Sequence, residues 1–315
     1  MREEVINIFE IPHAARGYID RYLSREEIGA ILKMGKERYG RDELVGLLEG
    51  VVDAPERFVS DAYRRAVFDK VEEDGVVYYK IANFYRRLAY FSQYEPDAWK
   101  AIPKESREGM EEWYLGVYAE GARPRLEESL REPGKLIENA FFYTLEETLD
   151  LIDRLDNDEF VVVPCNCKAV SLRCEDRKPQ NVCLQLYDGI NTDWDRGHGR
   201  HVNKNEAKDL IRWANKNGLM QTTEMGYGIC NCCGCCCYPI RASRIIGAKG
   251  LWPRKMYDIV WNEKACIKCG KCANICNFGA FSKEGGISFD REKCWSCTIC
   301  ANHCPSGAIT LRSAE

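Results

Sequence analysis

The chain has 315 residues, enough for two or three domains that each bury a core. Its net charge of -4 and its pI of about 5.8 argue against a general nucleic-acid-binding protein. The N-terminus is acidic at Glu3 and Glu4, and no apolar run approaches the length that spans a bilayer. We therefore expect a cytoplasmic protein with no signal peptide and no membrane insertion.

All 18 cysteines lie between Cys165 and Cys304, and the first half of the chain has none. Cysteines form disulfide frameworks mainly in small secreted proteins, whereas this chain is large. Their number and placement therefore favour metal or cluster ligation in a reducing compartment.

Three helices are predicted near the N-terminus. Ser24 and Glu27 have the spacing of a capping box and open the first helix. Asp42 starts the second, and the third covers residues 56–65.

Two predicted strands, 66–71 and 76–81, follow these helices and are joined by an Asp-Gly turn typical of hairpins. Three helices and a hairpin outline a winged helix, so we predict a winged-helix-like domain over residues 1–95. Such domains usually bind DNA, but residues 1–120 contain 18 Lys and Arg against 24 Asp and Glu, a net charge of -6 that repels phosphate. A packing or docking role is favoured, and nucleic acid is disfavoured as a partner.

Residues 96–140 are predicted to form a helical connector, with a helix over residues 105–118. Residues 84–135 are dense in aromatic side chains, which more often form a core or a subunit interface than a cofactor site. A homodimer is therefore one of the alternatives.

A small α/β cysteine-rich domain is predicted over residues 141–255. Thr144 and Glu147 form a capping box at the start of a helix, and residues 160–163 are a buried strand by length and β-branching. This strand ends just before the first two cysteines. A second capped helix is predicted over residues 203–217.

This domain contains ten cysteines, and six of them fall within the eight residues from Cys230 to Cys237. Neighbouring residues on any backbone point in different directions, so these six cannot all pack into one core. Ten thiols suffice for one or two further [4Fe-4S] clusters; one cluster with a reactive thiol pair is the alternative. The candidate ligands are Cys165, Cys167, Cys174, Cys183, Cys230, Cys232, Cys233, Cys235, Cys236 and Cys237.

Lys168, Arg173, Arg177 and Lys178 lie among the first four of these cysteines. Cations near a cluster offset its negative charge and raise its potential, while an ordinary solvated loop is an equal alternative. His201 lies in a Gly-flanked loop, where a surface position is favoured over a role as ligand or proton donor.

Residues 256–315 contain the spacing C-x2-C-x2-C-x3-C twice. The two copies are Cys266, Cys269, Cys272, Cys276 and Cys294, Cys297, Cys300, Cys304. Three thiolates two residues apart can surround one corner of an iron–sulfur cube, while the fourth points away to the other cube. Two zinc sites are the alternative, but zinc ribbons use separate C-x2-C pairs.

This duplicated segment resembles the bacterial 2[4Fe-4S] ferredoxin family, which implies a pseudo-twofold βαβ-βαβ domain with two [4Fe-4S] clusters. The expected ligands are Cys266, Cys269, Cys272 and Cys304 for the first cluster, and Cys294, Cys297, Cys300 and Cys276 for the second. Asn277 stands where the family expects proline after the fourth cysteine of the first copy, which alters the local turn or the hydrogen bonding at one sulfur.

Residues 140–255 resemble an uncharacterised family of anaerobe iron–sulfur proteins. The matching stretches are Pro164 to Lys168, Glu206-Ala207, Gly218-Leu219 and Ile229 to Cys237. The resemblance implies an iron–sulfur protein and no particular reaction.

Taken together, the patterns predict an α+β chain that passes single low-potential electrons to or from a partner oxidoreductase. The first alternative is an anaerobic reductase whose central cluster or spare thiols act on a small substrate or disulfide, fed by the ferredoxin domain. The second is a redox-responsive winged-helix regulator. No Rossmann, Walker or catalytic-triad spacing is visible, so catalytic residues are not assigned.

Overall fold

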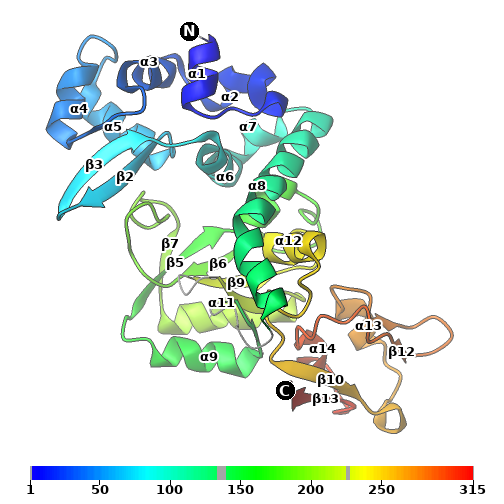
Figure 1. Ribbon diagram of the computed structural model, residues 1–315. Coiled ribbons are helices and arrows are strands. Elements are labelled where there is room, and N and C mark those ends of the chain that lie inside the picture. Colours follow the sequence, from blue (N-terminus) through cyan, green and yellow to red (C-terminus); the bar gives the residue numbers. More distant parts are fainter. Residues whose placement is uncertain (1, 133–139, 225–227, 315) are drawn as a thin grey trace. The chain divides into compact units, whose positions relative to one another are not determined.

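A computed structural model describes residues 2–132, 140–224 and 228–314 (Figure 1). The chain divides into two compact units. The first contains Met1–Tyr114, Ala169–Ser171 and Asp188–Gly199, and the second contains the remaining segments. Among the described residues, no helix is long and apolar enough to cross a membrane.

The first unit is a helical region with one small sheet. Its elements are α1 (Arg2–Ile8), η1 (His13–Tyr18), α2 (Ile19–Tyr22), α3 (Arg25–Met34), β1 (Arg38–Tyr39), α4 (Arg41–Leu48), α5 (Pro55–Arg64), β2 (Phe68–Glu73), β3 (Val76–Ile81), α6 (Phe84–Tyr94) and α7 (Pro96–Lys100). The long helix α8 (Lys104–Arg131) begins in this unit and ends in the second.

The three predicted helices and the hairpin are present. Ser24 caps α3, since its hydroxyl accepts from the Glu27 backbone N–H while the Glu27 carboxylate accepts from the Ser24 N–H. β2 and β3 pair in antiparallel register, and the short β1 adds to the other edge of β3. The turn between β2 and β3 has Asp74 and Gly75 at positive φ, which explains the Asp-Gly sequence.

Residues 188–199, for which the sequence analysis gives no chemical role, pack against the hairpin and α5. Arg196 is 2% exposed; its guanidinium donates to the carbonyl oxygens of Tyr63 and Phe68 and to the Asp69 carboxylate. Asp195 accepts from the Tyr63 hydroxyl and from Lys70. These buried polar contacts hold the segment in place because each charge has a partner.

The second unit is built on a six-stranded antiparallel sheet of order β4-β8-β9-β6-β5-β7 (Figure 1). Its elements are β4 (Phe142–Tyr143), α9 (Leu145–Arg154), β5 (Glu159–Pro164), α10 (Asn166–Ser171), β6 (Asn181–Gln185), β7 (Arg200–Asn203), α11 (Lys204–Lys216), β8 (Met220–Glu224), β9 (Gly228–Cys232) and α12 (Tyr238–Ile246). The predicted capping box at Thr144 and the predicted helix cap at Asn203 are both formed.

One face of this sheet carries the apolar core. Phe160 and Val162 of β5, together with Leu184 of β6, pack with Ile152 of α9 and Ile211 of α11. Strand residues alternate between faces, so the neighbouring positions of β5, β6 and β9 point to the opposite face. That opposite face receives several of the central cysteines.

The last part of the second unit has the order of a duplicated βαβ domain. Its elements are β10 (Tyr257–Trp261), η2 (Glu263–Ala265), α13 (Lys271–Ile275), β11 (Phe281–Ser282), β12 (Ser288–Phe289), α14 (Ile299–Asn302) and β13 (Ile309–Ser313). β10 pairs with β13 and β11 with β12, so each small sheet takes one strand from each half. The molecule is therefore a mixed α+β protein.

Candidate metal centres

The four cysteines expected to bind the first ferredoxin-type cluster line one cavity. Cys266, Cys269 and Cys272 reach it from the loop before α13 and from α13 itself, and Cys304 reaches it from the segment after α14. Trp261 and Ile309 complete the apolar wall. The structure thus brings together the three ligands of one repeat and the fourth of the other, as the crossed ligation pattern requires.

The other set of ferredoxin cysteines is also gathered in one place. Cys276 lies close enough to Cys294, Cys297 and Cys300 for the charges of these thiolates to oppose one another. Burial is the main reason that the pKa of the Cys297 thiol rises to about 12. A thiol held so strongly in its protonated form ionises readily only when a metal binds it.

The loops that carry these cysteines have the same backbone conformation in both repeats. Lys268 and Ser296, which occupy equivalent positions, both have φ of 56°. Each donates its backbone N–H to the sulfur two residues earlier: Lys268 to Cys266 Sγ at 3.4 Å and Ser296 to Cys294 Sγ at 3.3 Å. Such N–H···S bonds leave the sulfur partly neutralised and tune the potential of a bound cluster.

Asn277 joins the ferredoxin-type part to the central sheet. Its side-chain amide donates to the Gly218 carbonyl oxygen at 3.0 Å, a contact that a proline could not make. Its backbone oxygen lies so near Gly234 that a Cβ at that glycine would be 2.4 Å away. Gly234 lies within the central cysteine run, so the residue after Cys276 touches the loop that carries the central thiols.

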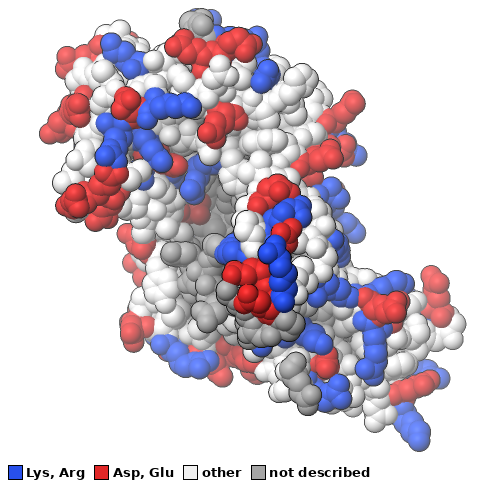
Figure 2. Space-filling view, viewed as in Figure 1, with Lys and Arg blue, Asp and Glu red and all other residues white. Residues whose placement is uncertain are grey.

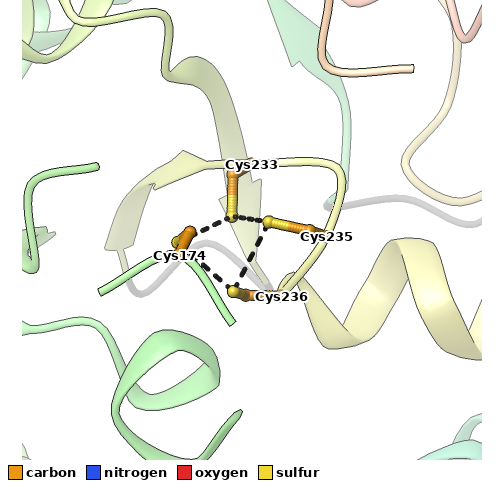
Figure 3. A group of neighbouring side chains, drawn as sticks. All are labelled: Cys174, Cys233, Cys235 and Cys236. Carbon is orange, nitrogen blue, oxygen red and sulfur yellow. Dashed lines mark hydrogen bonds between the residues drawn. The ribbon is translucent and has the colours of Figure 1, made fainter. Parts of the chain in front are cut away.

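Four central cysteines converge in one buried group, drawn in Figure 3. Their sulfur atoms all lie within 4.8 Å of one another, and we call them the four-thiol group: Cys174, Cys233, Cys235 and Cys236. The measured contacts are Cys174–Cys233 3.7 Å, Cys174–Cys236 3.3 Å, Cys233–Cys235 3.5 Å and Cys235–Cys236 3.7 Å. Three of these residues come from the turn after β9, and Cys174 comes from the loop after α10.

The thiols of the four-thiol group are close enough to hydrogen-bond one another, which shifts the pKa of each of them. Hydrogen bonds from neighbouring thiols lower the pKa of Cys233 well below its usual range and that of Cys235 to about 7. The same bonds raise the pKa of Cys174 and Cys236, because their protons are shared with the ionised sulfurs. Four sulfurs this close together can bind one metal ion, which would take the place of the shared protons. The group can therefore hold a metal and suggests a further centre.

The remaining six central cysteines influence one another's pKa in series through thiol–thiol interactions. Cys165 interacts with Cys167 and Cys183. Cys183 interacts with Cys230, Cys230 with Cys232, and Cys232 with Cys237. We call this the six-thiol group: Cys165, Cys167, Cys183, Cys230, Cys232 and Cys237.

The sheet register explains how the six-thiol group assembles. Leu184 of β6 pairs with Ile229 of β9, which brings the adjacent residues Cys183 and Cys230 opposite each other on the other face. Cys232 follows two residues after Cys230 and so shares that face. Of the remaining members, Cys165 directly follows β5, Cys167 lies in the first turn of α10, and Cys237 directly precedes α12.

Cys232 and Cys233 are consecutive but enter different surroundings. Cys232 packs with Met220, Ile240 and Trp295. Cys233 packs instead with Val182, Ala214 and Leu219. The chain therefore changes direction between Cys232 and Cys233. The two groups of thiols adjoin, because Cys165 and Cys183 of the six-thiol group pack in the same apolar cluster as Cys233.

Lys168 lies beside both groups. Its side chain is buried (the residue is 1% exposed), and its ammonium donates to the carbonyl oxygens of Pro179 at 2.9 Å and Asn231 at 3.0 Å. Burial alone would lower its pKa, but the negative charge of nearby thiolates, Cys165 and Cys183 first among them, raises the pKa above its usual range. A lysine in this position remains a cation.

The other cations predicted to lie near the central thiols are more exposed than Lys168. Lys178 is partly buried; its ammonium donates to the carbonyl oxygens of Asn217 and Gly218 and interacts with the charge of Cys233. Arg173 and Arg177 are exposed. His201 lies on β7, where its ring nitrogen is 2.7 Å from the Glu159 carboxylate, so it occupies a surface position.

None of the 18 cysteines, all of which lie in the described part of the chain, forms a disulfide. All of these thiols are candidate ligands from the sequence alone, but the sequence does not show how the ten central ones divide. Gly234 is not predicted either, because its contact with Asn277 joins positions far apart in the chain and follows no local pattern.

Comparison with known protein families gives one match, to a 4Fe-4S dicluster domain, over residues 265–308. No curated protein matches the chain. No solved structure matches it either. Residues 265–308 thus form a 4Fe-4S dicluster domain, which implies two [4Fe-4S] clusters in this part of the protein.

Proposed function

We propose that the protein is an electron-transfer protein in which the dicluster domain exchanges single electrons with a central, thiol-ligated metal centre. The supporting observation is the packing between these two regions. Cys297, an expected ligand of the second ferredoxin-type cluster, shares one buried apolar cluster with the central residues Cys232 and Cys237. Redox centres whose ligands share one buried cluster lie close together, as electron transfer needs.

The number of ferredoxin-type thiols and the burial of the central thiols support the same role. The eight ferredoxin-type cysteines supply four thiolates per cluster, which leaves no iron open to a substrate there. The central thiols are mostly buried, so a centre bound by them would exchange electrons without contact with bulk solvent. The external donor or acceptor would be a partner oxidoreductase.

This function is tested with the full chain purified without oxygen and reduced by a one-electron donor such as titanium(III) citrate. Rapid freezing followed by EPR should show electrons first on the ferredoxin-type clusters and then on the central centre. Cys297→Ser, which removes an expected ligand of the second cluster, should slow the second step at least tenfold. A central centre that stays oxidised while both ferredoxin-type clusters are reduced would contradict the proposal. A central signal that shifts on addition of a small disulfide would instead favour a reductase.

We also propose that residues 1–95 are a winged-helix-like docking domain. The order helix, short strand, two helices and hairpin supports this, since it is the order of a winged helix. Residues 1–120 are acidic overall, and on the face drawn in Figure 2 positive and negative side chains are intermixed. Both features disfavour DNA as the partner. A gel shift across ionic strength tests this, and salt-sensitive DNA binding would contradict it.

A further inference from the structure

The two groups of central thiols differ in number and in geometry. Four sulfurs that bind one ion at about 2.3 Å stand at the corners of a tetrahedron with edges of about 3.8 Å. The four contacts measured in the four-thiol group are 3.3 to 3.7 Å. A four-iron cube holds its sulfurs farther apart, because each sulfur binds a different iron. The four-thiol group therefore has the spacing of a single ion.

The dicluster domain of the same chain shows the other geometry. There the four cysteines of the first site, Cys266, Cys269, Cys272 and Cys304, surround a cavity. Among the described residues, the sulfurs of the four-thiol group all lie within 4.8 Å of one another, whereas the sulfurs of this site belong to no such set. The four-thiol group therefore differs from the expected cluster site in its geometry.

The six-thiol group has too many sulfurs for one tetrahedral ion. Its members interact in series from Cys167 through Cys165 and Cys183 to Cys230, Cys232 and Cys237, and the pairing of β6 with β9 sets Cys183 opposite Cys230. The two ends approach each other again, because Cys167 Sγ accepts the backbone N–H of Tyr238, the residue after Cys237, at 3.4 Å. Six thiols exceed the four that one tetrahedral ion binds, and among centres with several metals buried thiolate sites select iron–sulfur clusters.

The surroundings of the six-thiol group suit a redox role. Cys232 and Cys237 pack against Trp295 and Cys297 of the dicluster domain. The buried ammonium of Lys168 offsets part of the negative charge that a thiolate-ligated cluster brings. The four-thiol group, by contrast, joins Cys174 to the turn between β9 and α12, as a structural metal site joins a loop to a turn.

We propose that the ten central thiols form two metal centres of different kinds: a single tetrahedral ion, zinc or iron, in the four-thiol group, and an iron–sulfur cluster in the six-thiol group. The proposal rests on sulfur geometry and not on the electron-transfer function. If the metal content agrees while no electrons pass between the regions, the function above fails and this inference stands.

The test is the metal and sulfide content of the full chain, purified without oxygen and compared with two double variants. We expect the wild type to contain about twelve acid-labile sulfides, four for each of three clusters, and about twelve irons plus one further zinc or iron ion. Cys183→Ser with Cys230→Ser should lose about four irons and about four sulfides and keep the single ion. Cys174→Ser with Cys236→Ser should lose one ion and no sulfide.

Each double variant controls for the other, and the EPR signal of the ferredoxin-type clusters reports whether the chain still folds. If the Cys174/Cys236 variant loses sulfide, the single-ion assignment is overturned. If the Cys183/Cys230 variant keeps all its sulfide, the cluster assignment is overturned. If both variants prove insoluble, the wild type still decides: about eight sulfides exclude a central cluster, and about sixteen exclude a single ion.

Discussion

The dicluster domain and the central cysteine-rich sheet both gather thiols, but they do so by different means. In the dicluster domain the ligands come from two short loops, and the spacing between Cys266 and Cys272 is enough to place three of them around one cavity. In the central region the six-thiol group takes residues from several separate segments, and strand pairing brings Cys183 and Cys230 together. The first site depends on local sequence and the second on the whole sheet.

The largest expected effect comes from a substitution that should disrupt the central site and leave the ferredoxin-type sites intact. Phe160 of β5 is fully buried in the core face of the sheet, and β5 leads directly to Cys165 and Cys167. Phe160→Ala should destabilise the central region by about 3–5 kcal/mol through lost packing. The central metal should be lost while both ferredoxin-type clusters remain, which metal analysis and a denaturant titration monitored by EPR would show.

Trp213→Ala is the matched control for this change, since Trp213 of α11 is 48% exposed and its loss should cost little. If Phe160→Ala removed the central and ferredoxin-type metals in parallel, the two regions would be one cooperative unit and the comparison would fail.

The difference between sites built from local sequence and sites built by strand pairing explains which features the sequence predicts and which it does not. The capped helices α3, α9 and α11 and the hairpin of β2 and β3 follow from local signals, and the structure has all of them. The dicluster domain follows from its cysteine spacing. The division of the central cysteines at Cys232 and Cys233 depends on the order of six strands, which no short pattern specifies.

The polar contacts of residues 188–199 could not be predicted from the sequence either, because they too depend on the fold. Arg196 binds the carbonyl oxygens of Tyr63 and Phe68, more than a hundred residues earlier in the chain. Nothing around Arg196 in the sequence distinguishes it from a solvated arginine. Long-range partners of a single charged residue become apparent only when the fold is known.

The next prediction concerns the contact between the two regions. In Gly234→Ala the new Cβ would stand 2.4 Å from the Asn277 backbone oxygen, so the dicluster domain and the central loop must separate locally. Because electron transfer weakens steeply with distance, the rate between the ferredoxin-type and central centres should fall about tenfold, a factor worth ~1.4 kcal/mol of barrier. Rapid-freeze EPR measures it.

Gly121→Ala is the control, because that helical glycine has open space where its Cβ would be. Metal content should be measured for both variants, so that loss of the nearby thiol ligands is recognised. An unchanged rate in Gly234→Ala with all metals present would show that this contact does not carry the electron.

A smaller effect is expected when the buried cation is removed. Lys168→Met deletes a positive charge beside the six-thiol group and should lower the potential of its centre by roughly 40–130 mV, or about 1–3 kcal/mol for one electron. The potentials of the ferredoxin-type clusters should move much less. An EPR-monitored redox titration measures both regions in one sample.

Arg177→Met is the matched control, since it removes an exposed cation from the same segment and solvent screens its charge. Equal shifts for Lys168→Met and Arg177→Met would mean that burial gives Lys168 no special influence on the centre.

The smallest effect distinguishes the side chain of Asn277 from its backbone. Asn277→Ala removes the hydrogen bond to the Gly218 carbonyl oxygen but leaves the backbone contact with Gly234 intact. We expect a loss of about 0.5–1.5 kcal/mol in the free energy of unfolding and an electron-transfer rate closer to wild type than that of Gly234→Ala. Asn274→Ala, whose exposed side chain accepts only from Lys283 among the contacts described, controls for a lost surface amide. If Asn277→Ala slowed electron transfer as much as Gly234→Ala, the side-chain hydrogen bond and not the close backbone approach would keep the two regions together.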